Sequence, residues 1–205
     1  MPLPLIDMQH LVATCAPEVA PQTLLSIAKV ESGFDPLAIG VNWPAPMRLH
    51  PHTKEEAIAT ATRLIAAGGN VDLGVSQINS RNLGWLGLMI SNAFDACRNL
   101  AASARIIATD YGRAAPTSGG EQAALRTALS YYNTGDPRRG YRNGYVAKVM
   151  VAAGQVVPAL TPQGDLPPAA APSLAPATPA WDVFAQRSQP TSGFVFNPQL
   201  SGDDR

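Results

Sequence analysis

Apolar residues follow the spacing of one helix face in five segments of the chain. A helical period of 3.6 residues brings positions i, i+3, i+4 and i+7 to the same side. No segment alternates apolar and polar residues over a useful length, and only residues 71–75 predict a brief extended piece. The pattern therefore predicts a mainly α fold. The apolar stripes are Leu24, Ile27 and Ala28; Ile58, Ala61, Leu64 and Ile65; Cys97, Leu100, Ala104, Ile107 and Tyr111; Leu125, Ala128, Leu129 and Tyr132; and Tyr145, Val146 and Val149.

Start and stop signals support these helices. Pro21 is a good first-turn residue because its missing N–H would have no partner there. Thr53-Lys-Glu-Glu56 has the form of a capping box, in which a Thr hydroxyl and a Glu carboxylate satisfy free backbone N–H groups. The helix that begins at this capping box is stopped by Gly68-Gly69, and Gly135 ends the fourth helix. The sequence thus predicts a helical domain over residues 10–155.

The composition changes near residue 157. Of the 23 residues from 158 to 180, seven are proline and seven are alanine, without any helical or strand period. Such a segment buries too little apolar surface to offset its chain entropy, which predicts a linker and flexible tail over residues 156–205. Apolar residues return in two short islands. Such islands suit folding on the surface of a partner, or they are incidental aromatics in a disordered tail. The islands contain Trp181, Val183 and Phe184, and Phe194 and Phe196.

Charge narrows the choice of partners. The chain has 15 basic and 15 acidic residues, a formal net charge of zero, whereas proteins that bind nucleic acid or anionic membranes usually carry a basic surplus. The first residues show neither a secretion signal nor a membrane span. The histidines and cysteines lack the spacing of a metal site. Cys15 and Cys97 are equally compatible with buried thiols and with a disulfide.

Glu31 is the first candidate for chemistry. It continues the apolar stripe of Leu24, Ile27 and Ala28 by one step. Burial disfavours the ionised form of a carboxyl and raises its pKa, as a general acid requires near neutral pH. Glu31 alternatively lies at a partly solvated helix end before Ser32-Gly33. The position alone does not decide between these readings.

Two further segments offer sugar-binding groups. Gly74-Val-Ser-Gln-Ile-Asn79 combines a glycine, which allows close backbone approach, with two amides that both donate and accept hydrogen bonds. Tyr131-Tyr-Asn-Thr-Gly135 is also explained as a plain helix end with core tyrosines. Each segment alone is weak evidence for a site.

In combination these motifs resemble the soluble lytic transglycosylase family. The matching segments are Glu31-Ser32, Gly74-Val-Ser-Gln-Ile-Asn79, Ala128-Leu-Ser-Tyr-Tyr-Asn-Thr-Gly135 and Tyr145-Val146, in the family's order. Val75-Ser76 departs from the family's usual Leu-Met. The long insert between the first two motifs, and the cysteine in Phe94-Asp-Ala-Cys97, resemble the branch that serves type IV secretion and conjugation.

The resemblance implies a lysozyme-like helical fold around a glycan cleft, with Glu31 as catalytic acid and base. It also favours a disulfide between Cys15 and Cys97. A basic cluster follows the fourth helix, at Arg138, Arg139 and Arg142. Such a cluster suits contact with the carboxylates of peptide stems on the glycan, but is more often a solvated loop face. The residues implied to bind the substrate or position the catalytic carboxylate are Ser32, Gly74, Ser76, Gln77, Asn79, Tyr132, Asn133 and Tyr145.

A single acid suffices if the substrate supplies the nucleophile. N-acetylmuramic acid carries a 6-hydroxyl that attacks its own C1, so the expected product is a 1,6-anhydro sugar and no metal or organic cofactor is needed. The expected location is the periplasm, where peptidoglycan lies, and components of a type IV secretion machine are expected partners. Two rivals remain: a muramidase in which Asp35 or Asp72 helps water attack, and a glycan-binding scaffold without activity.

Overall fold

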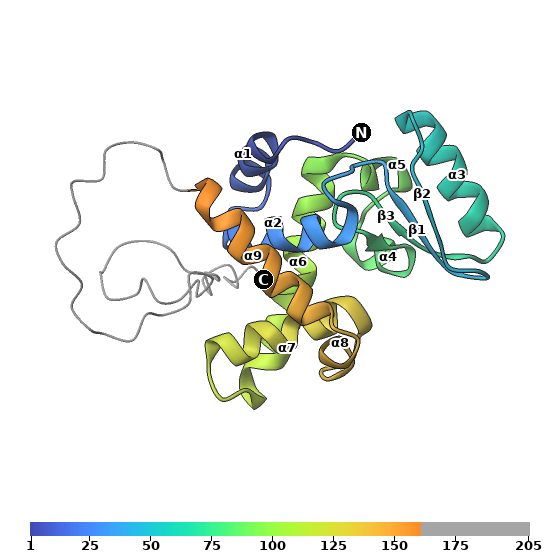
Figure 1. Cartoon of the computed structure of the whole chain (residues 1–205). Helices are drawn as coiled ribbons and strands as arrows, with labels where there is room; N and C mark the ends of the chain where they lie inside the picture. The colour runs from blue at the N-terminus through green and yellow to red at the C-terminus, as the bar shows by residue number, and fades with distance from the viewer. Residues whose placement is uncertain (161–205) are drawn as a thin grey trace, which may run out of the picture.

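The computed structural model describes residues 1–160, with the side chains of residues 1–156. Its elements form a helical lobe at one end and a small sheet with its covering helices at the other (Figure 1). The mainly α prediction is confirmed. The Pro/Ala-rich segment beyond residue 160 and the aromatic islands around Trp181 and Phe194 lie outside the described residues.

The helical lobe is built around helix α2, Pro21–Ser32. Pro21 opens the helix as predicted, and the residues from Thr23 to Ala28 are all buried. Because this stretch is covered on every side, its packing fixes where the helix end points. The surrounding helices are α1 (Leu5–Cys15), α6 (Ala96–Ala114), α7 (Glu121–Thr134), α8 (Arg139–Arg142) and α9 (Tyr145–Leu160).

The predicted boundaries differ from the observed helix ends. Helix α1 was not predicted, yet its Met8 and Val12 belong to the main core and are fully buried. Helix α9 was expected to be short, but it runs to Leu160. Helical structure therefore extends about five residues beyond each predicted boundary of the domain.

The sheet is the main feature that the apolar pattern missed. Four antiparallel strands lie in the order β2-β1-β3-β4, although only β3 was foreseen as an extended piece. None is longer than five residues, which is too short for alternation to stand out in the sequence. The strands are β1 (Ile39–Trp43), β2 (Met47–Leu49), β3 (Asn70–Leu73) and β4 (Ile78–Asn79).

Helix α3, Lys54–Ala66, covers the sheet and packs Ala57 and Ala61 into a second core with Val71 and Leu73. Thr53 caps this helix by accepting from the Glu56 N–H, as predicted. The capping box is incomplete, because the Glu56 carboxylate accepts from the His52 N–H instead of that of Thr53. The remaining short helices of this lobe are η1 (Ser80–Asn82), α4 (Leu83–Leu86) and α5 (Ile90–Ala93), and η2 (Ala115–Thr117) follows α6.

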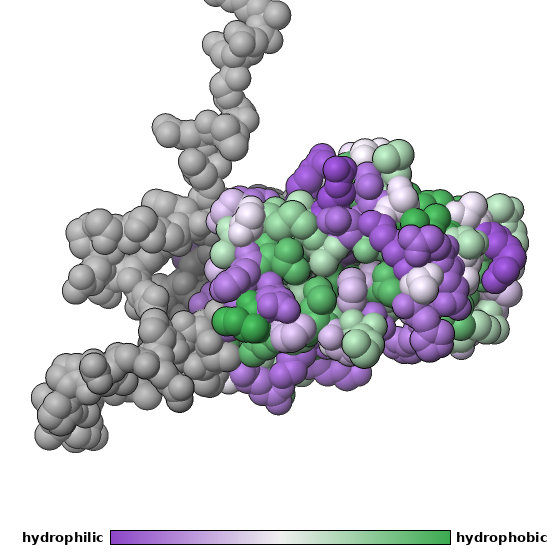
Figure 2. All heavy atoms as spheres, turned by 90° about the horizontal axis from the view of Figure 1, so that it is seen from above, coloured by the Kyte–Doolittle hydropathy of each residue, from purple (hydrophilic) through white to green (hydrophobic). Residues whose placement is uncertain are grey.

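Hydrophilic and hydrophobic side chains are interleaved on the face shown in Figure 2, with hydrophilic residues gathered toward the end that α3 occupies. Among residues 1–160, no helix is both long and apolar enough to cross a membrane.

Cys15 and Cys97 form a disulfide between the end of α1 and the first turn of α6. Their Cα atoms are 5.3 Å apart, and the bridge spans 82 residues of sequence. The bridge thus joins the N-terminal helix to the longest helix of the lobe.

We predict that a Cys15→Ser/Cys97→Ser variant unfolds at a lower urea concentration than the oxidised protein. Releasing a loop of this length lowers the free energy of unfolding by about 4–5 kcal/mol in the chain-entropy model. The reduced wild-type protein is the matched control and should unfold like the double variant. Thiol titration of the unfolded, unreduced protein should find no free thiol, and two free thiols would contradict the bridge.

Candidate functional site

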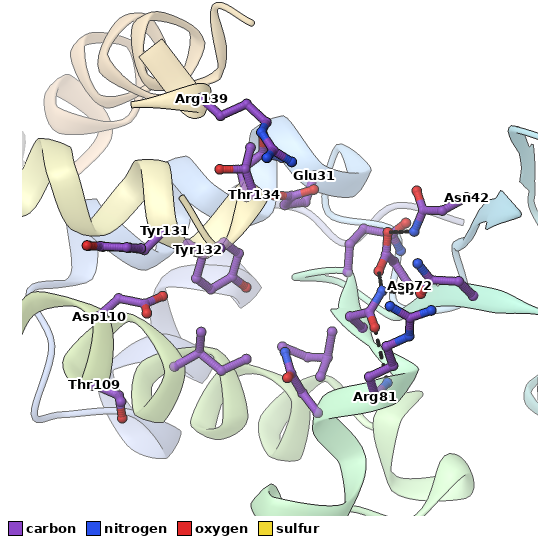
Figure 3. Close-up of a pocket in the computed structure, with 18 of the residues that line it drawn as sticks. Glu31, Asn42, Asp72, Arg81, Thr109, Asp110, Tyr131, Tyr132, Thr134 and Arg139 are labelled. Atoms are coloured by element: carbon purple, nitrogen blue, oxygen red, sulfur yellow. Dashed lines mark hydrogen bonds between the residues drawn. The ribbon is translucent and has the colours of Figure 1, made fainter. Parts of the chain in front are cut away.

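A polar cleft of about 610 Å³ lies between the two lobes. The sheet side and the helical side both line it, and Glu31 faces it from the end of α2 (Figure 3). From the sheet side the lining residues include Asn42, Asn70, Asp72, Gln77, Asn79, Arg81 and Trp85. From the helical side they include Ile106, Asp110, Tyr131, Tyr132, Asn133, Thr134 and Arg139.

The end of α2 holds Glu31 in place. Gly33 has a φ of 65° and stops the helix in the left-handed conformation that glycine adopts without strain. The Glu31 carbonyl accepts a hydrogen bond of 2.5 Å from Arg48 of β2. The backbone at Glu31 is therefore anchored to the sheet as well as to the helix.

The Glu31 carboxyl is electrostatically unusual. Its pKa is raised to about 7, mainly by burial and to a smaller extent by the negative charge of Asp72. The Tyr145 hydroxyl opposes this shift by donating a 2.7 Å hydrogen bond to Oε1, and Arg48 opposes it through its positive charge. Near pH 7 the carboxyl is thus present in both protonated and ionised forms, as a group that must give and take one proton requires.

Tyr145 was expected to hold the catalytic carboxylate, and its hydroxyl does contact it. Tyr132 lies on the cleft wall, where its hydroxyl donates to the Ser76 carbonyl at 2.9 Å and lies 2.9 Å from the Ser103 hydroxyl. Asn133 lines the cleft and accepts from the Asn143 amide at 2.8 Å. Tyr132 and Asn133 therefore line the cleft, and Tyr145 contacts Glu31.

Gln77 and Asn79 both line the cleft, but their amides are engaged within the protein. Gln77 donates to the carbonyls of Ala38 and Gly74, at 3.0 and 2.8 Å, with its backbone at a φ of 50°. Asn79 donates to Asp72 at 2.6 Å. These amides shape the cleft wall and orient a carboxylate.

Three expected contacts do not occur. The Ser32 hydroxyl has one proton and donates it to the Val75 carbonyl at 2.7 Å, so it does not hold the Glu31 carboxylate. A Cβ on Gly74 would lie 2.2 Å from the Ala93 carbonyl oxygen, so the glycine admits protein backbone and not a ligand. Ser76 is fully buried and donates its N–H to Asn99 at 2.8 Å.

Asp72 and Asp110 are the other two acids of the cleft. Asn42 donates to Oδ2 of Asp72 at 2.7 Å, and Asn79 donates to Oδ1 at 2.6 Å. Burial raises the pKa of Asp72. Asp110 lies at the other end of the site, beside Tyr131 (Figure 3), and burial raises its pKa to about 6. The motifs named Asp72 only as a rival's residue and gave no signal for Asp110.

The other acids of the motifs are used elsewhere. Asp35 is buried outside the cleft lining, where it accepts from the Leu37 N–H at 3.1 Å and meets His50 at 2.9 Å. Asp136 accepts from the N–H groups of Arg138 and Arg139 at 2.9 and 2.8 Å, which lowers its pKa. Both act as turn-forming groups.

The three arginines after the fourth helix separate in the structure. Arg139 lines the cleft beside Thr134, whereas Arg138 and Arg142 do not (Figure 3). Arg81, which no motif singled out, lines the opposite wall near Asp72. Among residues 1–160, no group of three or more His, Cys, Asp or Glu side chains is arranged to hold a metal ion.

The sequence matches the Transglycosylase SLT domain family over residues 9–149. This match agrees with the mainly α, lysozyme-like domain expected from the motifs. No solved structure gives a significant match.

Curated relatives share more than two fifths of their aligned residues with the chain. Protein virB1 of Agrobacterium fabrum (strain C58) is 42% identical over 160 residues, covering 78% of this chain and 64% of that protein. Protein virB1 of Rhizobium radiobacter is 44% identical, covering 80% and 69%. Type IV secretion system protein virB1 of Brucella abortus biovar 1 is 43% identical, covering 68% and 60%. The chain thus spans between 60% and 69% of the length of these relatives.

We predict that Tyr145→Phe raises the pKa of Glu31 by about one pH unit. The Tyr145 hydrogen bond stabilises the ionised carboxyl, and the variant removes it. A carboxyl-carbon NMR titration of Glu31 measures this shift. Tyr132→Phe is the matched control, since its hydroxyl donates to a backbone carbonyl, and it should leave the Glu31 titration near pH 7. An unchanged Glu31 titration in Tyr145→Phe would mean that the hydrogen bond does not stabilise the ionised form.

Proposed function

The chain belongs to the transglycosylase SLT domain family, and we propose that it is a lytic transglycosylase that cleaves peptidoglycan between N-acetylmuramic acid and N-acetylglucosamine. The observation that carries this proposal is Glu31, a half-buried carboxyl with a pKa of about 7 that faces a polar cleft. The same proposal makes 1,6-anhydro-N-acetylmuramic acid the product.

The proton movements follow from the state of Glu31. In its protonated form the carboxyl donates to the glycosidic oxygen as the C1–O bond breaks, and the acetamido oxygen of the substrate stabilises C1. The Glu31 carboxylate then removes the proton of the 6-hydroxyl as that oxygen bonds to C1. The proton returns to Glu31 and the cycle closes without water as a reactant.

Intramolecular attack is favoured by proximity. A well-oriented hydroxyl within the same sugar acts at an effective concentration on the order of 10⁵ M or more. Water at about 55 M competes only if a second group orients it. Both oxygens of Asp72 accept a hydrogen bond from an amide, and its negative charge raises the pKa of Glu31.

The muramidase alternative rests on one observation, namely that Asp72 lines the cleft with Glu31. Asp35, its other candidate, is buried away from the cleft lining. The scaffold alternative would be favoured by a Glu31 that is exposed and remote from Gln77 and Tyr132, whereas all three residues line one cleft.

The cellular role in the proposal is local opening of the cell wall for a type IV secretion or conjugation apparatus. Its support is the name of the Brucella relative, a type IV secretion system protein. Peptidoglycan as substrate implies a periplasmic site of action. Partners in the secretion machine belong to the same proposal, with the aromatic islands of residues 181–196 as the expected contact.

Glu31→Gln should lower the rate of peptidoglycan cleavage by at least about 100-fold, since the amide keeps the shape of the side chain but cannot transfer the proton. Clearance of a peptidoglycan suspension measures the rate, and circular dichroism checks the fold. Asp110→Asn is the matched control, an acid-to-amide change in the same cleft, and should cost less than about tenfold. Near-normal cleavage by a folded Glu31→Gln protein would contradict the assignment of Glu31.

Mass spectrometry of purified fragments tests the reaction itself. Anhydro products are lighter than hydrolysed ones by one water, about 18 Da. We expect anhydro ends from the wild-type protein and from Asp72→Asn, because attack by the tethered hydroxyl outcompetes attack by water. Reducing muramic acid ends that disappear in Asp72→Asn would instead establish the muramidase reading.

A further inference from the structure

Helices α2 and α9 form a second groove, separate from the polar cleft. The two helices cross and pack against each other (Figure 1), and an open groove of about 450 Å³ lies between them. From α2 it is lined by Lys29 and Val30. From α9 it is lined by Lys148, Val151 and Gln155, which share one face of the helix. No residue of the groove also lines the polar cleft.

The groove carries apolar surface that the described residues do not cover. Val151 is 63% exposed, whereas Val149, on the other side of the same helix, is buried in the main core. Val30 is half-buried beside the core and also faces the groove. A groove of this size, with two valines in its lining, suits an aromatic or aliphatic side chain from another segment.

Two lysines give the groove a positive charge. Lys29 and Lys148 are the charged residues among those that line it, one from each helix. Neither forms an ion pair with any side chain of residues 1–156. A ligand that complements the groove therefore combines apolar side chains with a carboxylate.

The sequence beyond α9 contains such a combination. Trp181-Asp-Val-Phe184 places the carboxylate of Asp182 between an aromatic and an aliphatic residue. The other island, Phe194-Val-Phe196, is equally apolar, but no acid stands between Ser192 and Leu200. Charge complementarity therefore selects the first island as the ligand of the groove.

The length of the chain allows the first island to reach the groove. Helix α9 ends at Leu160, and Trp181 follows 21 residues later. An extended chain of this length spans up to about 65 Å, at about 3.1 Å per residue. Gln155 and Lys148 lie only about 8 and 18 Å back along the helix.

Tethering also strengthens a weak contact. A segment joined to the groove by a short linker is present at an effective concentration on the order of 1 mM. A contact with a dissociation constant of about 0.1 mM would then occupy about 90% of the grooves. The short groove, lined by seven residues, suits such a segment better than a second copy of the chain, because a stable dimer takes about 20–30 residues from each partner.

We propose that residues 181–184 dock in the α2–α9 groove of their own chain. Trp181 and Phe184 contact the valines of the groove, and Asp182 faces its two lysines. This inference goes beyond the proposed function, because it concerns neither the cleft nor the reaction. It leaves the second island as the contact for a partner, and it keeps the first island away from the cleft.

A spin label in the full-length protein tests the docking. Ser188→Cys supplies the one free thiol, because both native cysteines are in the disulfide. With a nitroxide on this thiol, the amide NMR signals of Val30, Lys148 and Val151 should lose at least about half of their intensity, since most grooves are occupied. Reduction of the nitroxide by ascorbate should restore them. Signals of α3, at the far end of the sheet lobe (Figure 1), should not change. Unaffected groove signals would overturn the proposal.

Two double variants test which island docks. Trp181→Ser/Phe184→Ser in the spin-labelled protein should abolish the intensity loss along the groove. Phe194→Ser/Phe196→Ser is the matched control, with the same number of aromatic rings removed from the same tail, and should keep it. Equal effects of the two double variants would overturn the choice of the first island.

A charge exchange tests the contact with the lysines. Asp182→Lys should weaken the docking by about tenfold, which lowers the occupied fraction from about 90% to about 50%. Lys29→Glu/Lys148→Glu in the same chain should restore the intensity loss, because both signs are then reversed. An exchange without recovery would overturn the pairing of Asp182 with these lysines.

A mixed sample distinguishes the chain's own groove from that of a second copy. Spin-labelled protein without isotopes is mixed with isotope-labelled protein that carries no spin label. Docking within one chain leaves the signals of the mixture at full intensity. The same intensity loss as in the singly prepared protein would place the segment in another copy and overturn the proposal.

Peptidoglycan clearance separates this inference from the proposed function. Trp181→Ser/Phe184→Ser should clear purified peptidoglycan at the wild-type rate, because the groove and the cleft share no lining residue. A failure of docking with normal clearance would refute the inference alone. Normal docking with hydrolytic products would refute the proposed reaction alone.

Discussion

The site depends on one constraint: a carboxyl group must stay partly desolvated at the end of a helix whose central turns are buried. The packing around α2 fixes the position of Glu31, and the loss of water around the carboxyl raises its pKa to about 7. A more exposed carboxyl would be ionised at neutral pH and unable to donate. The hydrogen bond from Tyr145 limits the shift, so the ionised form also remains accessible.

The turn after β3 connects this helix end to the rest of the cleft. Ser32 donates to the Val75 carbonyl, and Tyr132 donates to the next carbonyl, that of Ser76. Asn99 of α6 fixes the same turn by accepting from the Ser76 N–H and donating to the Leu73 carbonyl. Helices α2, α6 and α7 are thereby tied to one short segment of the sheet lobe. Residues expected to bind sugar, such as Ser32 and Ser76, instead set the distance between the two walls.

The sequence carried the parts of the structure that local patterns determine. Helical stripes around Leu24 and Leu100 were readable because each spans several turns, and Glu31 followed from the first of them. The sheet was not readable, because its strands have two to five residues and pair with partners far along the chain. Asn99 and Asp110 were missed for the same reason: a polar residue on a helix gives no sign of whether it meets water, a backbone group or a cleft.

The charged groups of the cleft affect the pKa of Glu31. Glu31, Asp72 and Asp110 share one cavity, which Arg81 and Arg139 line from opposite sides, and burial raises the pKa of all three acids. The Asn42 and Asn79 amides stabilise the ionised form of Asp72 against burial, and its negative charge then acts on Glu31. A hydrogen-bonded carboxylate on the sheet therefore helps a carboxyl on the helix retain its proton. The sheet lobe thus acts on Glu31 through the charge of Asp72 as well as by lining the cleft.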